Sequence, residues 1–144
     1  MIVKLLSKQI PAFWDAIKFA VAQADEVDEK DLQPYLNELL HALLNEKAQC
    51  FVALDEARVL VGLLVTRVQI DKITGDKYLL LQSAYVWKKQ EMSEWTAMYE
   101  MFRKFAEKEQ CKYISFSSRN PAMWSRPIAL GFVEKTRVFT LNLV

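Results

Sequence analysis

The chain has 144 residues, 52% of them hydrophobic and 12% aromatic, a composition that excludes intrinsic disorder. Its formal net charge of +1 gives no overall positive field that would attract a nucleic acid. Three glycines, two cysteines and one histidine leave no Gly-rich phosphate loop, no histidine-based triad and no metal site. The first apolar stretch is too short and too interrupted for a signal peptide or a membrane span. The sequence therefore predicts one domain, residues 1–144, in a cytoplasmic protein without a membrane or nucleic-acid partner.

The first part of the chain predicts a short strand followed by two helices. Residues 2–6 read as the strand, and Pro11 favours the first turn of a helix because its missing N–H would be unpaired there anyway. The acidic stretch 25–31 breaks the helical spacing and predicts a solvated loop. His41 falls on the polar face of the second helix, so we expect it to be solvated. The apolar face of that helix consists of Leu32, Tyr35, Leu36, Leu39, Leu40 and Leu43.

From residue 48 onward the apolar period changes to that of strands. The predicted elements are strands at 50–56, 58–71 and 77–87, a helix with Ser93 as its N-cap, a strand at 111–118, a short helix at 121–130 ended by Gly131, and a closing strand at 132–144. We expect Cys50 and Cys111 to be buried thiols rather than a disulfide. The order β-α-α-β-β-β-α-β-α-β predicts an α/β (α+β) fold, one mixed sheet with helices on both faces.

Over nearly the whole chain this order resembles the GCN5-related N-acetyltransferase (GNAT) family. The hairpin that contains Gly62, the strand–loop–helix at 79–108 and the spacing from Asn120 to Gly131 carry the resemblance. It implies a mostly antiparallel GNAT-like sheet and an N-acyltransferase that moves an acetyl or other acyl group from acetyl-CoA, or a related acyl-CoA, to a small-molecule or peptide amine. The chain is also similar to small divergent proteins of this kind among tailed-phage gene products.

The resemblance places the CoA pyrophosphate at the start of the third helix, where the family has Gln or Arg, two residues, Gly, one residue, and Gly or Ala. The cofactor-binding positions this implies here are Lys88, Lys89, Gln90, Glu91, Met92, Ser93, Glu94 and Trp95, together with Asn120. Gln90 fits the family pattern, whereas Ser93 and Trp95 replace both small residues. Glu91 and Glu94 already complement the helix dipole, while the two lysines can pair with phosphates. These residues are compatible with either a phosphate site or an ordinary capped helix start.

The resemblance also places the pantetheine arm and the thioester against the family's fourth strand, which splays from the fifth. The backbone of Ser83, Ala84, Tyr85 and Val86 fills this place. Gln82 and Ser83 stand where a glutamate often serves as base, and Pro127 stands where a tyrosine often protonates the leaving thiolate. The candidate catalytic residues are therefore Ser83 and Tyr85, and the cofactor-binding backbone is that of Ala84 and Val86.

Three functional hypotheses follow from these substitutions. The first is an active N-acyltransferase, and the second is a catalytically silent GNAT-like binding or structural module. The third is self-association through the closing strand, whose alternating apolar residues would make an adhesive sheet edge if unpaired, so a homodimer stays open. Trp87, Trp95 and Trp124 are expected at one end of the sheet, either as packing or as a hydrophobic groove.

Overall fold

Helices and strands follow one another in nearly the predicted order. The computed structural model describes residues 1–119 and 121–144. Its elements are β1 (Ile2–Lys4), the 3-10 turn η1 (Ser7–Gln9), α1 (Ile10–Asp25), α2 (Glu29–Leu44), β2 (Ala48–Leu54), β3 (Leu60–Ile70), β4 (Lys77–Val86), α3 (Met92–Lys108), β5 (Tyr113–Phe116), the 3-10 turn η2 (Pro121–Met123) and α4 (Ser125–Ala129). None of these helices is both long enough and apolar enough to cross a membrane.

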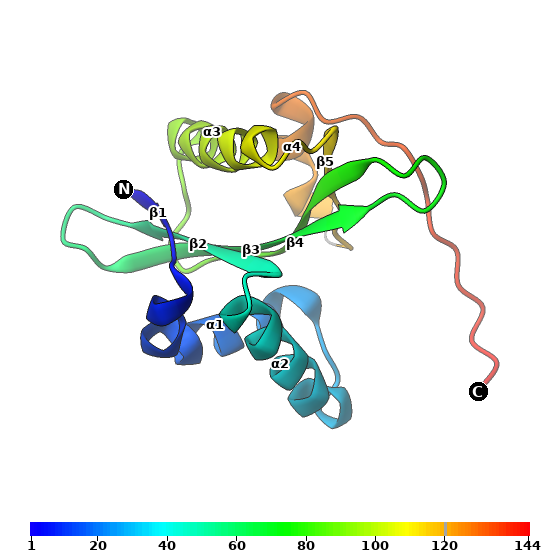
Figure 1. The fold of residues 1–144 in the computed structure, drawn as a ribbon, viewed down its shortest axis with the longest axis horizontal. Helices are drawn as coiled ribbons and strands as arrows, with labels where there is room; N and C mark the ends of the chain where they lie inside the picture. Colours follow the sequence, from blue (N-terminus) through cyan, green and yellow to red (C-terminus); the bar gives the residue numbers. More distant parts are fainter. Residues whose placement is uncertain (120) are drawn as a thin grey trace.

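The five strands form one sheet in the order β1-β2-β3-β4-β5. The strands from β1 to β4 pair antiparallel with their neighbours, and β5 pairs parallel with β4. α1 and α2 lie on one face of this sheet, and α3 and α4 lie on the other (Figure 1). The predicted mixed, mostly antiparallel sheet with helices on both faces is confirmed.

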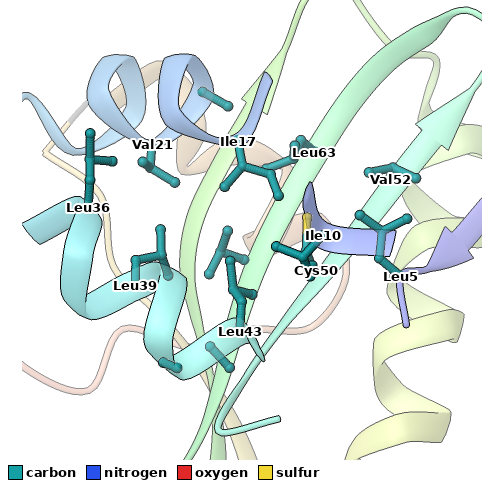
Figure 2. Packing of buried hydrophobic residues seen from close by; sticks show 14 residues of the cluster. Leu5, Ile10, Ile17, Val21, Leu36, Leu39, Leu43, Cys50, Val52 and Leu63 are labelled. Carbon is teal, nitrogen blue, oxygen red and sulfur yellow. The ribbon is translucent and has the colours of Figure 1, made fainter. Parts of the chain in front are cut away.

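The first face of the sheet is sealed by a cluster of aliphatic side chains from α1, α2 and the central strands (Figure 2). Pro11 lies in the first turn of α1, as its missing N–H predicts. Ile17 and Val21 of α1 and Leu39 of α2 are each 0% exposed. Their helical spacing places them on the sides of α1 and α2 that pack on the sheet. Leu63 of β3 belongs to the same cluster. This packing fixes α1 against the sheet, which matters for the site below.

The acidic stretch at 25–31 is mostly helical, so the predicted loop is too long. α1 continues through Asp25, and α2 begins at Glu29. Glu29 and Asp31 lie in the first turn of α2, where carboxylates interact favourably with the N–H groups and the helix dipole. Only residues 26–28 connect the two helices, and Asp25 is part of α1.

The second face of the sheet is covered by α3. Met98, Phe102 and Ala106 of this helix are buried and belong to a second cluster, which includes Phe51 of β2 and Leu79 of β4. The two clusters explain why the strands read as continuous apolar runs, because alternate side chains of one strand are buried on opposite faces.

Both cysteines are free thiols, which rules out the disulfide alternative. Cys50 is buried in the first cluster, and burial raises the pKa of its thiol to about 12. Cys111 is half-buried rather than buried. His41 is exposed on α2, as predicted.

The closing strand predicted at 132–144 is absent. Gly131, at a φ of 100°, follows α4 as the predicted helix stop, and Phe132 packs against Tyr99 of α3. Residues 133–144 then leave the domain as an extended arm (Figure 1). The alternation of apolar residues there is typical of a strand, but a strand also needs a hydrogen-bonded neighbour, and residues 1–119 and 121–132 supply none.

Candidate functional site

The parallel strands β4 and β5 separate halfway along β4. Their pairing covers only Tyr78 to Leu81 on β4 and Tyr113 to Phe116 on β5. β4 itself continues to Val86, still paired with β3. Beyond Leu81, this edge of β4 therefore has no strand partner in the part of the chain that the structure describes.

The backbone groups that face the open edge follow from the antiparallel hydrogen-bond alternation. The Trp87 N–H donates to the Val61 carbonyl at 2.9 Å, so the odd-numbered residues of this part of β4 bond to β3. The even-numbered residues, Ala84 and Val86, consequently direct their N–H and C=O groups toward the side that β5 has left. These two residues are the ones whose backbone the family resemblance assigns to the pantetheine arm.

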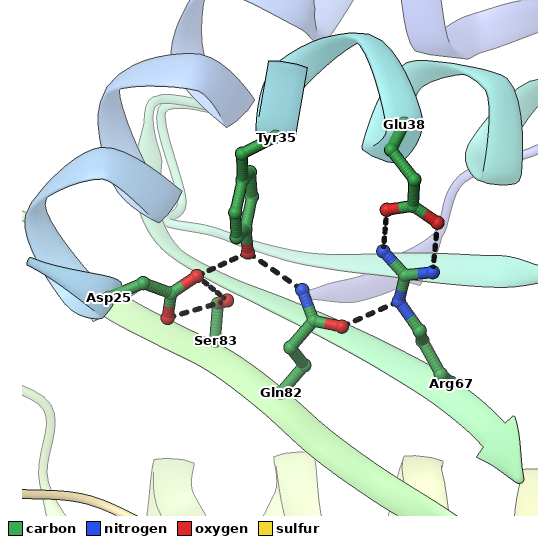
Figure 3. Close-up of polar contacts among 6 residues, drawn as sticks. All are labelled: Asp25, Tyr35, Glu38, Arg67, Gln82 and Ser83. Carbon is green, nitrogen blue, oxygen red and sulfur yellow. Dashed lines mark hydrogen bonds and ion pairs between the residues drawn. The ribbon is translucent and has the colours of Figure 1, made fainter. Parts of the chain in front are cut away.

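An irregularity in β4 brings two consecutive polar side chains onto the α1/α2 face. The pairing of β3 with β4 shifts register between Val65 and Thr66, which pair with Ser83 and Leu81, so Gln82 is the extra residue. A bulge of this kind re-aims side chains next to it. Gln82 bonds to Tyr35 of α2, and Ser83 bonds to Asp25 of α1 (Figure 3).

The centre of these contacts is the carboxylate of Asp25, at the C-terminal end of α1 (Figure 3). The Ser83 hydroxyl lies 2.9 Å and 2.7 Å from its two oxygens, and the Tyr35 hydroxyl donates to Oδ2. Gln82 Nε2 donates to the Tyr35 hydroxyl at 2.7 Å. Burial, and then the hydrogen bond to Asp25, raise the pKa of Tyr35 to about 12. The phenol thus stays protonated at neutral pH and holds the carboxylate in place as a donor.

Arg67 extends the network to the solvent. Its Nε donates to Gln82 Oε1 at 2.5 Å, and its two terminal nitrogens bond both carboxylate oxygens of Glu38 at 2.7 Å and 2.6 Å. A bidentate pair of this type fixes the guanidinium plane. Arg67 therefore orients Gln82, which in turn orients Tyr35.

The pair of Glu38 and Arg67 gives a pH-dependent prediction. The Arg67 hydrogen bonds hold the pKa of Glu38 below its ordinary value of 4.5. A carboxyl group whose pKa is lower in the folded than in the unfolded state stabilises the protein at pH values above its unfolded-state pKa. This stabilisation is lost as the pH falls through the folded-state pKa. We expect Glu38→Gln to remove this part of the acid sensitivity in urea unfolding curves measured from neutral to acidic pH. Because Glu38 is exposed, its part is below about 1 kcal/mol. An unchanged pH profile would contradict the assignment. Glu56→Gln, at an exposed position in the turn between β2 and β3, is the control.

Three aromatic side chains continue the site along the same face of β4. Tyr85 and Trp87 follow Ser83 at two-residue intervals, so their side chains share its side of the strand. The Phe19 ring of α1 lies 5.6 Å from Tyr85 and 6.2 Å from Trp87 between ring centroids. Phe19 and Trp87 are 47% and 39% exposed, so this aromatic group is open to a ligand.

The start of α3 differs from the sequence prediction in its cap. The helix begins at Met92 with Glu91 as the N-cap, so Ser93 lies inside the first turn. The Glu91 N–H donates to the Glu94 carboxylate at 3.0 Å, a local contact that places the helix start before Ser93. Lys88 and Lys89 are exposed just ahead of it.

Trp95 fills the space between α3 and α4. Its Nε1 is buried without a hydrogen-bond partner among the described residues, and the Arg126 guanidinium lies 5.3 Å from the ring centroid. Arg126 also approaches the carbonyl of the buried Gln90 at 3.4 Å. A pocket of about 180 Å³ lies beside Trp95, between the start of α3 and residues of β1, β2, β3 and β4.

The three tryptophans do not form one cluster. Trp87 contacts Phe19 and Tyr85 on the α1 side of the sheet, while Trp95 contacts Arg126 on the α3 side. Trp124 donates its Nε1 hydrogen to the Ser118 carbonyl and is 48% exposed. The three tryptophan rings therefore do not line one common hydrophobic groove.

The structure brings together most of the site residues named from the sequence, and it adds others. Ser83, Ala84, Tyr85 and Val86 line the open part of β4, and positions 88–95 connect it to α3. Asn120 lies outside the described residues. Sequence reasoning missed Asp25, although one signal was present: it follows Ile17 and Val21 at four-residue spacing, which continues the sheet-facing side of α1.

Comparisons with known proteins show the fold of this chain. No protein-family model and no curated protein matches it. The aminoglycoside 6'-N-acetyltransferase AAC(6')-Ih from Acinetobacter baumannii is similar with a TM-score of 0.74 at 16% identity, over 99% of this chain and 96% of that one. An acetyltransferase from Clostridium acetobutylicum, assigned by prediction and solved with acetyl-CoA, gives 0.75 at 13% identity, over 99% and 96%. A GNAT family acetyltransferase from Staphylococcus aureus gives 0.64 at 14%, over 99% and 98%.

These similarities show that the chain has the GNAT acetyltransferase fold, as the family resemblance implies. They give no support to the phage-like resemblance, and they do not favour a catalytically silent module over an acyltransferase.

Proposed function

We propose that the chain is an N-acyltransferase that moves an acetyl or other acyl group from acyl-CoA to an amine. The observation that carries this proposal is the opening between β4 and β5, at whose start Ser83 holds the Asp25 carboxylate. Transfer to an amine needs polar groups that bind and polarise the acyl donor and a group that receives the amine and its proton. Both lie at the same place on β4.

The acyl donor is proposed to lie along the open edge of β4. The outward N–H and C=O groups of Ala84 and Val86 bond the pantetheine amides and polarise the thioester carbonyl. Lys88, Lys89 and the first amides of α3 meet the phosphates. The backbone part of this site fits the donor well, whereas the side chains of Trp95 and Glu94 restrict the phosphate part.

The chemistry assigned to Asp25 follows from its position. The acceptor enters as an ammonium ion paired with this carboxylate, and it loses one proton through Asp25 to solvent. The free amine attacks the thioester carbonyl carbon, a C–N bond forms, and the C–S bond breaks. CoA leaves as the thiolate and takes up the second proton of the amine nitrogen. That Tyr85 passes this proton to the thiolate stays a prediction.

The acceptor is proposed to be a cationic small-molecule or peptide amine. Its ammonium group pairs with Asp25, and its carbon skeleton lies against Phe19, Tyr85 and Trp87. Aromatic faces attract cations as well as apolar groups, so an aromatic group beside a carboxylate suits this class of ligand. We also propose a cytoplasmic location, because both thiols are free.

The proposal is tested by calorimetry with acetyl-CoA, followed by a thiol-release assay with a panel of primary amines. Binding of acetyl-CoA and amine-dependent release of CoA thiol are expected. CoA release that is the same with and without amine would mean hydrolysis rather than transfer. Absence of binding at millimolar acetyl-CoA, with no amide chemical-shift change over residues 83–95, would refute the proposal.

Trp95 gives a further prediction about the phosphate part of the site. Trp95→Ala should tighten CoA binding by about tenfold, roughly 1.4 kcal/mol, because it opens the space between α3 and α4 and releases Arg126 for a phosphate. Calorimetry with CoA measures this change. Trp124→Ala is the control, since its ring contacts the Ser118 carbonyl instead. Equal or weaker CoA binding by Trp95→Ala would show that the pyrophosphate does not use this space.

A further inference from the structure

The hydrogen bonds that lead to Asp25 all run in one direction, and Arg67 sets that direction (Figure 3). A guanidinium group has donors only, so the Gln82 side chain presents its oxygen to Arg67 Nε. The amide nitrogen of Gln82 consequently points at Tyr35 and donates to its hydroxyl oxygen. The hydrogen of the Tyr35 hydroxyl is then directed at Asp25, where it bonds to Oδ2. The donor in each of these bonds therefore follows from the chemistry of Arg67.

The two oxygens of the Asp25 carboxylate are not equivalent as a result. Oδ2 accepts from Tyr35, and it also lies nearer to the Ser83 hydroxyl, at 2.7 Å against 2.9 Å for Oδ1. A hydroxyl group has one hydrogen, and the shorter contact takes it. Each carboxylate oxygen has two lone pairs, so both lone pairs of Oδ2 are used. Among the described residues Oδ1 has only the longer Ser83 contact, and it is the oxygen left for a ligand.

We propose that Tyr35 is a positioning residue that restricts the acceptor at Asp25 to an alkylammonium ion and excludes a guanidinium ion. A guanidinium binds a carboxylate through two parallel hydrogen bonds, one to each oxygen, whereas an ammonium is a point charge that needs only one oxygen. With Oδ2 filled by Tyr35 and Ser83, Asp25 cannot form the bidentate pair. This inference rests on the proposed function, since it concerns the acceptor that the same carboxylate would receive.

Glu38 shows within the same network what a carboxylate with two open oxygens does. It binds the Arg67 guanidinium through both oxygens, at 2.7 Å and 2.6 Å. Asp25 differs because the network donates two hydrogen bonds to one of its oxygens. Since Glu38 also neutralises Arg67, the selectivity comes from hydrogen-bond geometry rather than from repulsion by Arg67, which would act on both cations alike.

The aromatic side chains beside Asp25 cannot make this distinction by themselves. Phe19, Tyr85 and Trp87 attract an ammonium and a guanidinium alike, because both cations interact with aromatic faces. A guanidinium keeps its proton at neutral pH, so it would block the site without reacting. The arrangement at Asp25 thus admits the amino terminus or a lysine side chain of a peptide, and it keeps an arginine side chain out.

The inference is tested with two probes of the same carbon skeleton, phenethylamine and phenethylguanidine, by calorimetry in the absence of acyl-CoA. The unmodified protein is expected to bind the amine at least about tenfold more tightly, the effect of one hydrogen bond to a charged group. Tyr35→Phe frees a lone pair of Oδ2, so phenethylguanidine should bind more tightly and the ratio of the two affinities should fall to about twofold or less. A merely structural role of Tyr35 would weaken both probes and leave the ratio unchanged.

Two further variants test the assignment to Oδ2. Ser83→Ala removes the second donor to this oxygen and should lower the same ratio, also if Tyr35→Phe does not fold. Tyr78→Phe is the matched control on β4, since its hydroxyl bonds to Gln69 at 3.0 Å instead, and it should keep the ratio of the unmodified protein. The inference is overturned by an unmodified protein that binds neither probe or both equally, or by a ratio unchanged in Tyr35→Phe and Ser83→Ala.

Thiol release with acetyl-CoA and phenethylamine separates this inference from the proposed function. Selective binding without CoA release, at a protein that also fails to bind acetyl-CoA, would refute the transferase and support the ammonium site. Amine-dependent CoA release by a protein that binds both probes equally would support the transferase and overturn the role of Tyr35.

Discussion

Asp25→Asn is expected to lower the rate of amine acylation by about 10²- to 10⁴-fold, the usual contribution of one proton-transferring group. The amide keeps the shape of the side chain and still accepts a hydrogen bond from Ser83 or Tyr35, but it neither pairs with an ammonium ion nor takes up its proton. Acetyl-CoA binding should stay within about twofold of the unmodified protein, because the donor is held by the β4 backbone. Thiol release and calorimetry measure the two quantities separately.

Glu26→Gln is the matched control for this substitution. Glu26 is the next residue, it is exposed, and it loses the same charge, yet it belongs to the connection after α1. A second readout is the ultraviolet titration of Tyr35, whose pKa of about 12 should fall in Asp25→Asn as the carboxylate is removed. Turnover by Asp25→Asn within twofold of the unmodified protein would remove Asp25 from the proposed chemistry, even if the tyrosine titration changed as expected.

Most of the fold could be predicted because burial leaves a periodic record in the sequence. Leu36, Leu39 and Leu43 keep helical spacing because one side of α2 packs on the sheet. Residues 50–54 of β2 and 60–65 of β3 are apolar without interruption because both faces of these strands are covered. The start of α3 differs from the prediction because serine is a favoured N-cap residue and glutamate is not, whereas the bond from the Glu91 N–H to the Glu94 carboxylate places the cap at Glu91.

The candidate site was only half predictable, because its polar centre joins distant segments. The backbone of Ala84 and Val86 could be assigned through the family resemblance. Asp25 and Ser83 lie 58 residues apart, and a bulge in β4 brings them together. Nothing local in the sequence marks that bulge. The arm was misassigned for a related reason, since alternation predicts a strand without naming its partner.

The packing of α1 gives the second large prediction, because this helix carries both Asp25 and Phe19. Ile17 is 0% exposed in the cluster that joins α1 and α2 to the sheet (Figure 2). Ile17→Ala removes buried methyl groups and leaves a cavity, so the free energy of unfolding should fall by about 2–5 kcal/mol. That is a large part of the roughly 5–15 kcal/mol typical of a domain. Urea unfolding followed by circular dichroism measures the change.

Two graded controls show whether the loss comes from burial at this site. Ile17→Val removes one methylene group and should cost about 0.5–1.5 kcal/mol, while Ile73→Ala, at a position 96% exposed in the turn after β3, should change the free energy of unfolding by less than about 0.5 kcal/mol. Since α1 also positions Asp25, any folded Ile17→Ala protein should lose acylation rate beyond the loss of folded protein. An equal cost for Ile17→Ala and Ile73→Ala would mean that α1 is not packed on the sheet as described, and the position of Asp25 beside Ser83 would fail with it.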